Sequence, residues 1–242
     1  MKMRRFLGLS LLAVSCVTTA GAQPEVGARI TPPPGEETQG ISWLIDRAEA
    51  SLTAGRTVSE VLTNESLMPA HAYPRFRSLI RDKAPTGTVT LVPSSEPGQR
   101  LHVRGKVSDA AGRPLAGALL YVYHTSAKGW YSDKAAHISG SSGDTRSARL
   151  FAYLRTDAAG RYEIHTIRPV GYPESDLPAH IHVQIETAGD PPRTRVTEIQ
   201  FDDDPRLTPL WRERSRQEGF VIVPVKREAG GAQSVVADFQ LR

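Results

Sequence analysis

Short stretches in which apolar residues alternate with polar ones dominate the chain from residue 85 onward. They are rich in β-branched residues and are separated by turn sequences such as Asp-Ala-Ala-Gly at 109–112 and 157–160. Many short strands without intervening helices predict a mainly β fold, a β-sandwich. We expect strands at 88–92, 101–107, 119–124, 162–167, 181–185, 197–201, 220–225 and 235–241. One short helix is expected to interrupt them at 207–217.

Before the predicted strands, the apolar residues have the spacing of helices. Between residues 41 and 84 apolar side chains recur at intervals of three and four, which predicts helices at 42–54 and 74–83. Between them, Thr57 and Glu60 have the spacing of a capping box, so a further short helix is expected to begin at Thr57. We expect these helices to form an arm with a structural role, packed on the main domain or on another subunit of a homo-oligomer.

The first residues have the pattern of a secretory signal peptide. A basic start is followed by an apolar run at 6–17, and Ala20-Gly21-Ala22 offers a cleavage site. We therefore expect an exported protein, periplasmic or secreted, with cleavage after Ala22. A cut before Cys16 is the less favoured alternative, and it would leave a lipid anchor. No later apolar run is long enough to span a membrane.

Charge and cysteine content narrow the picture further. The formal charge of the 242-residue chain is +4, and removal of residues 1–22 takes away three basic residues and no acidic one, which leaves +1. A nearly neutral mature chain gives no reason to expect nucleic acid as a partner. The single cysteine, Cys16, would be lost as well. We divide the chain into four parts: a signal peptide at 1–22, a proline-rich linker at 23–40, the helical arm at 41–84 and the β-sandwich domain at 85–242.

The strand predicted at 181–185 carries a candidate metal site. Residues i and i+2 of a strand point to one face, so His180 and His182 start about 6.5 Å apart and can converge on one metal ion. The alternative is an ordinary pair of hydrogen-bonded or solvent-facing histidines. Three other histidines have no fixed spacing to a partner, and we expect them at the surface or behind the ligands: His124, His137 and His165.

Several motifs between residues 99 and 205 occur together in a known order. They are Gly105-Lys106-Val107-Ser108-Asp109, Gly112-Arg113-Pro114, Gly129-Trp130-Tyr131, Thr156-Asp157-Ala158-Ala159-Gly160-Arg161-Tyr162, Thr166-Ile167-Arg168-Pro169, Gly171-Tyr172-Pro173 and Pro178-Ala179-His180-Ile181-His182. In these motifs the chain resembles the intradiol ring-cleaving dioxygenases, the family of catechol and protocatechuate dioxygenases. The resemblance implies the prealbumin-like β-sandwich of that family.

The resemblance also implies four ligands to a non-haem Fe(3+) ion: Tyr131, Tyr172, His180 and His182. Ferric iron is a hard cation that suits phenolate oxygen, and a bound trivalent ion strips the phenol of its proton. In the family the axial pair corresponds to Tyr172 and His182, and both tyrosines are implied to be catalytic, with the displaced tyrosinate acting as a base. The implied reaction is the cleavage of a catechol-like aromatic diol by O2 to a muconate-type diacid.

The chain departs from the family pattern around these ligands. Leu177 stands where the family commonly has an arginine, Glu198 aligns with a glutamine that helps to orient substrate, and Glu174 occupies a position that is aromatic in some members. We predict that Leu177, Glu198 and Arg168 contact substrate, and replacement of the missing arginine by Arg168 or Arg155 is one open alternative. Loss of one preorganised charge can lower a rate by about 10²–10³, so an atypical substrate and weak turnover are both open alternatives.

Other interpretations of the same residues stay open. The turn patterns also resemble transthyretin-like and carboxypeptidase-regulatory sandwiches, so a non-catalytic binding module is the alternative function. Zinc in the same site would need two unusual tyrosine ligands. The acidic run at 202–204 lacks the ligand spacing of a calcium loop, and we expect a solvated turn there.

Overall fold

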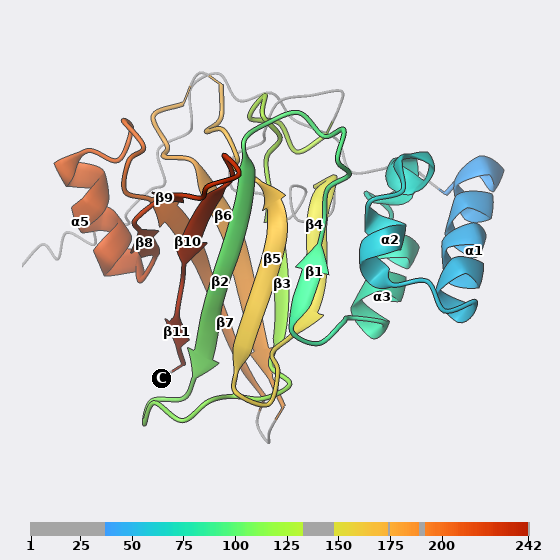
Figure 1. Cartoon of the computed structure of the whole chain (residues 1–242), viewed down its shortest axis with the longest axis horizontal. Helices are drawn as coiled ribbons and strands as arrows, with labels where there is room; N and C mark the ends of the chain where they lie inside the picture. Colours follow the sequence, from blue (N-terminus) through green and yellow to red (C-terminus); the bar gives the residue numbers. More distant parts are fainter. Residues whose placement is uncertain (1–36, 133–147, 174, 189–191, 242) are drawn as a thin grey trace, which may run out of the picture.

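The computed structural model describes residues 37–132, 148–173, 175–188 and 192–241 (Figure 1). The predicted signal peptide, most of the predicted linker, His137 and Glu174 lie outside these residues. Every helix within them is too short or too polar to cross a lipid bilayer.

Two sheets form the body of the molecule, which confirms the mainly β, sandwich fold (Figure 1). The first sheet has the order β1-β5-β2-β10-β9, with β11 also paired to β2: β1 Thr88–Thr90, β5 Arg161–Ile167, β2 Arg100–Ser108, β10 Gln233–Val236, β9 Lys226–Arg227 and β11 Phe239–Gln240. The second sheet has the order β4-β3-β6-β7-β8: β4 Leu150–Arg155, β3 Leu119–His124, β6 His180–Thr187, β7 Arg193–Phe201 and β8 Val221–Val223.

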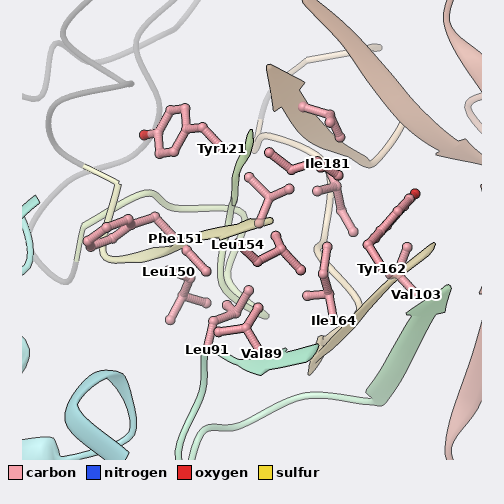
Figure 2. Close-up of a cluster of buried hydrophobic side chains, with 14 of the residues drawn as sticks. Val89, Leu91, Val103, Tyr121, Leu150, Phe151, Leu154, Tyr162, Ile164 and Ile181 are labelled. Atoms are coloured by element: carbon pink, nitrogen blue, oxygen red, sulfur yellow. The ribbon is translucent and has the colours of Figure 1, made fainter. Parts of the chain in front are cut away.

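Alternation along β6 shows how the sequence sorts its side chains between core and site. Ile181 is buried between the sheets, in the same cluster as Val103 and Ile164 of the first sheet (Figure 2). Burying one such side chain contributes about 1.5–3 kcal/mol to folding. His180 and His182 alternate with the core residues and therefore face the outer side of the second sheet. A shift of one residue in register would exchange the two sets.

Helices flank the sandwich on two sides (Figure 1). At the β4 side lie α1 (Gln39–Thr53), α2 (Val58–Leu62), the 3-10 helix η1 (Glu65–Ala70) and α3 (Pro74–Asp82). At the other side, α5 (Pro209–Glu218) precedes β8. The arm thus packs on the strands of its own chain, and α3 contacts β4 directly.

The helix starts follow local capping. Glu60 accepts a hydrogen bond from the backbone N–H of Thr57 at 2.7 Å while the Thr57 hydroxyl accepts one from the backbone of Glu60, so the predicted capping box is confirmed. The first helix begins at Gln39, three residues before the predicted start. Thr38 explains the difference, because its hydroxyl accepts a hydrogen bond from the backbone N–H of Ile41.

The prediction omits β4, η1 and β9. In β4 the residues Leu150–Leu154 lack a polar alternation, because both faces of the strand are covered. Phe151 faces the arm, where its ring meets that of Phe76 at 6.4 Å between centroids. Continuous apolar runs of this kind do not reveal strand or helix by periodicity.

The single strand predicted at 235–241 is wrong, because two short strands, β10 and β11, pair with β2 on either side of a break. The break lies at Ala237, whose carbonyl oxygen accepts a hydrogen bond from the Tyr162 hydroxyl at 2.6 Å. A Cβ on Gly105 would lie 1.8 Å from that oxygen, so the close approach requires glycine.

Candidate metal centre

Four side chains predicted to act together meet at the outer face of the second sheet. Tyr131 comes from the turn after β3, Tyr172 from the loop before β6, and His180 and His182 from β6 itself. The hydroxyl of Tyr131 lies 2.7 Å from that of Tyr172 and 2.8 Å from Nε2 of His182. Nε2 of His180 lies 2.9 Å from the Tyr172 hydroxyl and 3.1 Å from Nε2 of His182. Two phenol oxygens and two imidazole nitrogens therefore converge on one small region.

The centre is shielded from solvent. Tyr131, Tyr172 and His180 are 1%, 4% and 7% exposed. The other ring nitrogen of His180, Nδ1, lies 2.7 Å from the carbonyl oxygen of Pro178 and donates to it, which leaves Nε2 as the acceptor facing the phenols. A donor set of phenol oxygens and imidazole nitrogens suits ferric iron, so the residues present fit the ion that the resemblance implies.

The turn that carries Tyr131 depends on a glycine. Gly129 has a φ of 74°, and a Cβ there would lie 2.5 Å from the carbonyl oxygen of Gly171. Only glycine adopts this conformation at so close an approach without strain. The contact brings the Tyr131 turn against the loop of Tyr172, which is why the two phenols meet.

The turn after β7 braces the loop of Tyr172. The Arg206 guanidinium donates to the carbonyl oxygen of Tyr172 at 3.1 Å and reaches that of Leu177 at 3.5 Å. The Asp204 carboxylate accepts a hydrogen bond from the backbone N–H of Ala179 at 2.8 Å, immediately before His180. The acidic run at 202–204 is therefore more than a solvated turn. Sequence reasoning missed both residues as supports of the site, although their place directly after β7 was visible.

The arm supports the other tyrosine. The buried guanidinium of Arg77 in α3 donates to the carbonyl oxygen of Ala148 at 3.0 Å, and Nδ1 of His71 lies 3.0 Å from that of Arg149. The backbone N–H of Arg149 in turn donates to the carbonyl oxygen of Tyr131 at 2.8 Å. Side-chain hydrogen bonds from the arm to residues 148 and 149, followed by one backbone hydrogen bond, thus link the arm to Tyr131.

The three predicted substrate-contacting residues differ in their placement. Leu177 packs against the pair formed by Tyr131 and Tyr172. Glu198 places a carboxylate oxygen 3.5 Å from Nδ1 of His182. Arg168, however, directs its guanidinium to the Asp203 carboxylate and over the ring of Phe201.

The described hydrogen bonds of Arg168, Arg155 and His124 are with residues other than the four candidate ligands. The structure does not bring Arg168 to the phenol and imidazole cluster through any described contact, and Arg155 donates to the carbonyl oxygen of Gly117. His124 is fully buried, which excludes the first of its two expected positions, the surface; its Nε2 lies 2.7 Å from the Thr166 hydroxyl, and burial lowers its pKa to about 4. Its imidazole is therefore a neutral part of the core.

An aromatic ring fixes one of the histidines. Tyr123 of β3 lies opposite His182 in the strand register, and the two rings stack at 4.4 Å with an interplanar angle of 15°. Stacking on Tyr123 and the edge-on contact with the His180 ring restrict the rotation of this imidazole.

Comparison with known proteins places this constellation in a family. Residues 74–242 match the family model described as Dioxygenase. The chain belongs to the intradiol ring-cleavage dioxygenase family. Members of this family use non-haem iron(III), which agrees with the donor set.

Curated relatives and a solved structure agree with this assignment. The chain is 32% identical over 161 residues to catechol 1,2-dioxygenase 2 of Acinetobacter lwoffii, covering 59% of this chain and 54% of the relative. It is 29% identical over 177 residues to the catechol 1,2-dioxygenase of Candida albicans, covering 66% and 52%. The crystal structure of catechol 1,2-dioxygenase from Pseudomonas arvilla C-1 aligns with a TM-score of 0.50 at 25% identity, covering 65% of this chain and 57% of the other. The chain spans about half the length of the curated relatives that it matches.

Proposed function

We propose that this intradiol dioxygenase binds Fe(3+) through Tyr131, Tyr172, His180 and His182 and cleaves a catechol-like aromatic diol with O2 to a muconate-type diacid. One observation carries the proposal: two phenol oxygens and two imidazole nitrogens from three separate segments converge with contacts of 2.7 to 3.4 Å. A plain sandwich has no need to bring four such groups together in one place.

Bound iron(III) would supply a Lewis acid that activates the diol toward O2. Tyr131, His180 and His182 would hold the ion, since they are fixed by the sheet and by the Gly129 turn. Tyr172 sits on the braced loop, and its phenol oxygen would accept a proton from a substrate hydroxyl. Leu177 would give the diol an apolar wall beside the two tyrosines.

The test combines colour, metal content and turnover. Purified protein loaded with ferric iron should show the visible charge-transfer band of tyrosinate on iron, and it should consume O2 with catechol or a substituted catechol. Tyr131→Phe should weaken iron binding and alter the band. A folded wild-type protein that excludes iron would favour the non-catalytic binding module. A coloured protein that consumes O2 with neither catechol nor any substituted catechol tested would reject the proposed activity but not the proposed iron site.

We also propose that the protein works outside the cytoplasm, on the basis of the pattern at residues 1–22. Expression of the full chain in a bacterial host, followed by fractionation and N-terminal sequencing, tests this. Mature protein in the periplasm or medium that begins at Gln23 is the expected result. Uncleaved protein confined to the cytoplasm would reject it.

A further inference from the structure

Glu198 lies where strand register brings it against a candidate ligand. In the pairing of β6 with β7 it stands directly opposite His182. Its Oε1 lies 3.5 Å from Nδ1 of His182, whereas Nε2 of the same ring lies 2.8 Å from the Tyr131 hydroxyl. One imidazole therefore faces a carboxylate at one nitrogen and the phenol cluster at the other.

The carboxylate is held from behind. Its second oxygen, Oε2, accepts a hydrogen bond from the side-chain amide of Gln200 at 3.1 Å. The amide oxygen of Gln200 accepts one from the Ser215 hydroxyl of α5 at 2.7 Å, and both residues are almost fully buried. A chain of side-chain hydrogen bonds thus runs from α5 to the carboxylate that faces His182.

The two candidate histidine ligands are not equivalent as a result. Nδ1 of His180 donates to the neutral carbonyl oxygen of Pro178 at 2.7 Å, whereas Nδ1 of His182 faces a carboxylate. A carboxylate that accepts the N–H of a metal-bound histidine fixes its tautomer and makes the ring a stronger donor. It also adds negative charge beside a trivalent ion, which favours the ferric over the ferrous state.

We infer that Glu198 is a positioning residue for His182, which fixes its metal-binding nitrogen and strengthens its donation to iron. Gln200 and Ser215 hold the carboxylate in place for that role. The inference rests on the proposed iron site, and it differs from substrate contact, because Glu198 acts through His182. It also differs from direct ligation, in which Glu198 would join His180 and His182 on the ion, because Oε1 approaches His182 on Nδ1 whereas Nε2 of the same ring faces the phenols.

Isosteric Glu198→Gln is the main variant. It removes the charge and keeps the shape, so we expect it to retain iron while its affinity falls about 10- to 100-fold. With a weaker His182 donor the ferric ion becomes more acidic, and the tyrosinate charge-transfer band should move to longer wavelength. The midpoint potential of the iron should rise. Glu198→Asp keeps the charge and should recover part of each change.

Two further variants test whether the effect depends on the support of Glu198 and whether it is specific to the candidate metal centre. Gln200→Leu keeps the Glu198 charge but removes its support, and we expect a smaller shift of the band in the same direction. Glu163→Gln is the matched control, because the Glu163 carboxylate also faces a histidine, with Oε1 3.0 Å from Nε2 of His165, but on the first sheet. It should leave the band and the affinity unchanged.

The outcomes separate this inference from the proposed function. Glu198→Gln with an unchanged band, potential and affinity overturns the positioning role, whatever the turnover. Complete loss of iron overturns it in favour of direct ligation. A coloured wild-type protein that turns over no diol rejects only the proposed activity. In that case the band of Glu198→Gln can still be compared with that of the wild type, so the positioning role is still tested. A folded wild-type protein that takes up no iron rejects both.

Discussion

The described residues include two pairs of histidines, one on each sheet, with the same ring spacing and different surroundings. The rings of His180 and His182 and those of His102 and His165 both have centroids 4.6 Å apart. Each pair also has a carboxylate within hydrogen-bonding or ion-pairing distance. Ring spacing and a nearby acid are therefore not enough to define a metal centre.

The difference lies in what the ring nitrogens face. In the second sheet, the two Nε2 atoms face each other and two buried phenols. In the first sheet, His102 turns Nδ1 to Glu228 and His165 turns Nε2 to Glu163, each at 3.0 Å, and both side chains are about a third exposed. One pair becomes a candidate metal centre because two separate loops, positioned by Gly129 and Arg206, add phenol oxygens to it.

The largest expected effect comes from breaking the converging pair. His182→Ala removes a donor that the sheet holds in place, so we expect loss of the visible band and a fall of at least about 10² in O2 uptake. Iron analysis and oxygen electrode measurements check this. His165→Ala is the matched variant on the other sheet and should keep both colour and turnover. Equal losses from the two variants would contradict the contrast between the pairs.

A more limited change, in turnover but not in colour, should follow from removing one phenol oxygen. Tyr172→Phe takes away the proposed base, and general base catalysis contributes about 10²–10⁴ to a rate. We expect kcat to fall within that range while a tyrosinate band from Tyr131 persists. Single-turnover kinetics under O2, together with the visible spectrum, measure both. A normal kcat would show that Tyr172 does not move the substrate proton.

His71, a deeply buried histidine outside both pairs, sharpens the contrast with the exposed pair. Burial lowers the pKa of His71 from 6.5 to about 4. Above pH 6.5 this imidazole is neutral in both the folded and unfolded states. As the pH falls toward 4, the unfolded chain binds the proton first, so stability is lost over that window, by up to about 3 kcal/mol. Urea unfolding at several pH values should show this slope, and His71→Phe should reduce it by about half, because the buried His124, whose pKa is also lowered to about 4, contributes a similar slope. An equally steep slope in the variant would contradict the assignment.

The smallest effect is expected at the exposed pair itself. Glu163→Gln removes one of its carboxylates, and surface substitutions of this kind usually change stability by less than about 0.5 kcal/mol. Thermal unfolding compared with the wild type measures it. A loss above about 2 kcal/mol would show that this pair stabilises the first sheet more than its exposure indicates.

Much of this arrangement could be predicted from the residues. Alternation predicted seven of the strands closely enough to place His180 and His182 on one outer face, and the resemblance picked out Tyr131 and Tyr172. The sequence does not show which residues of distant segments lie opposite one another. The pairing of Glu198 with His182 depends on how β7 aligns with β6, and the Arg206 contact depends on where a turn folds back. Strand β4 stayed hidden because coverage on both faces erased its alternation.

The hydrogen bonds from the arm to residues 148 and 149 bear on how the protein can be shortened. The family match starts at residue 74 and the predicted sandwich at 85, yet His71 and Arg77 both hold the segment that is hydrogen-bonded to Tyr131. A truncated chain starting at either boundary would lose one or both of these anchors. The part of the chain needed to hold Tyr131 in place is therefore longer than the region matched by the family model.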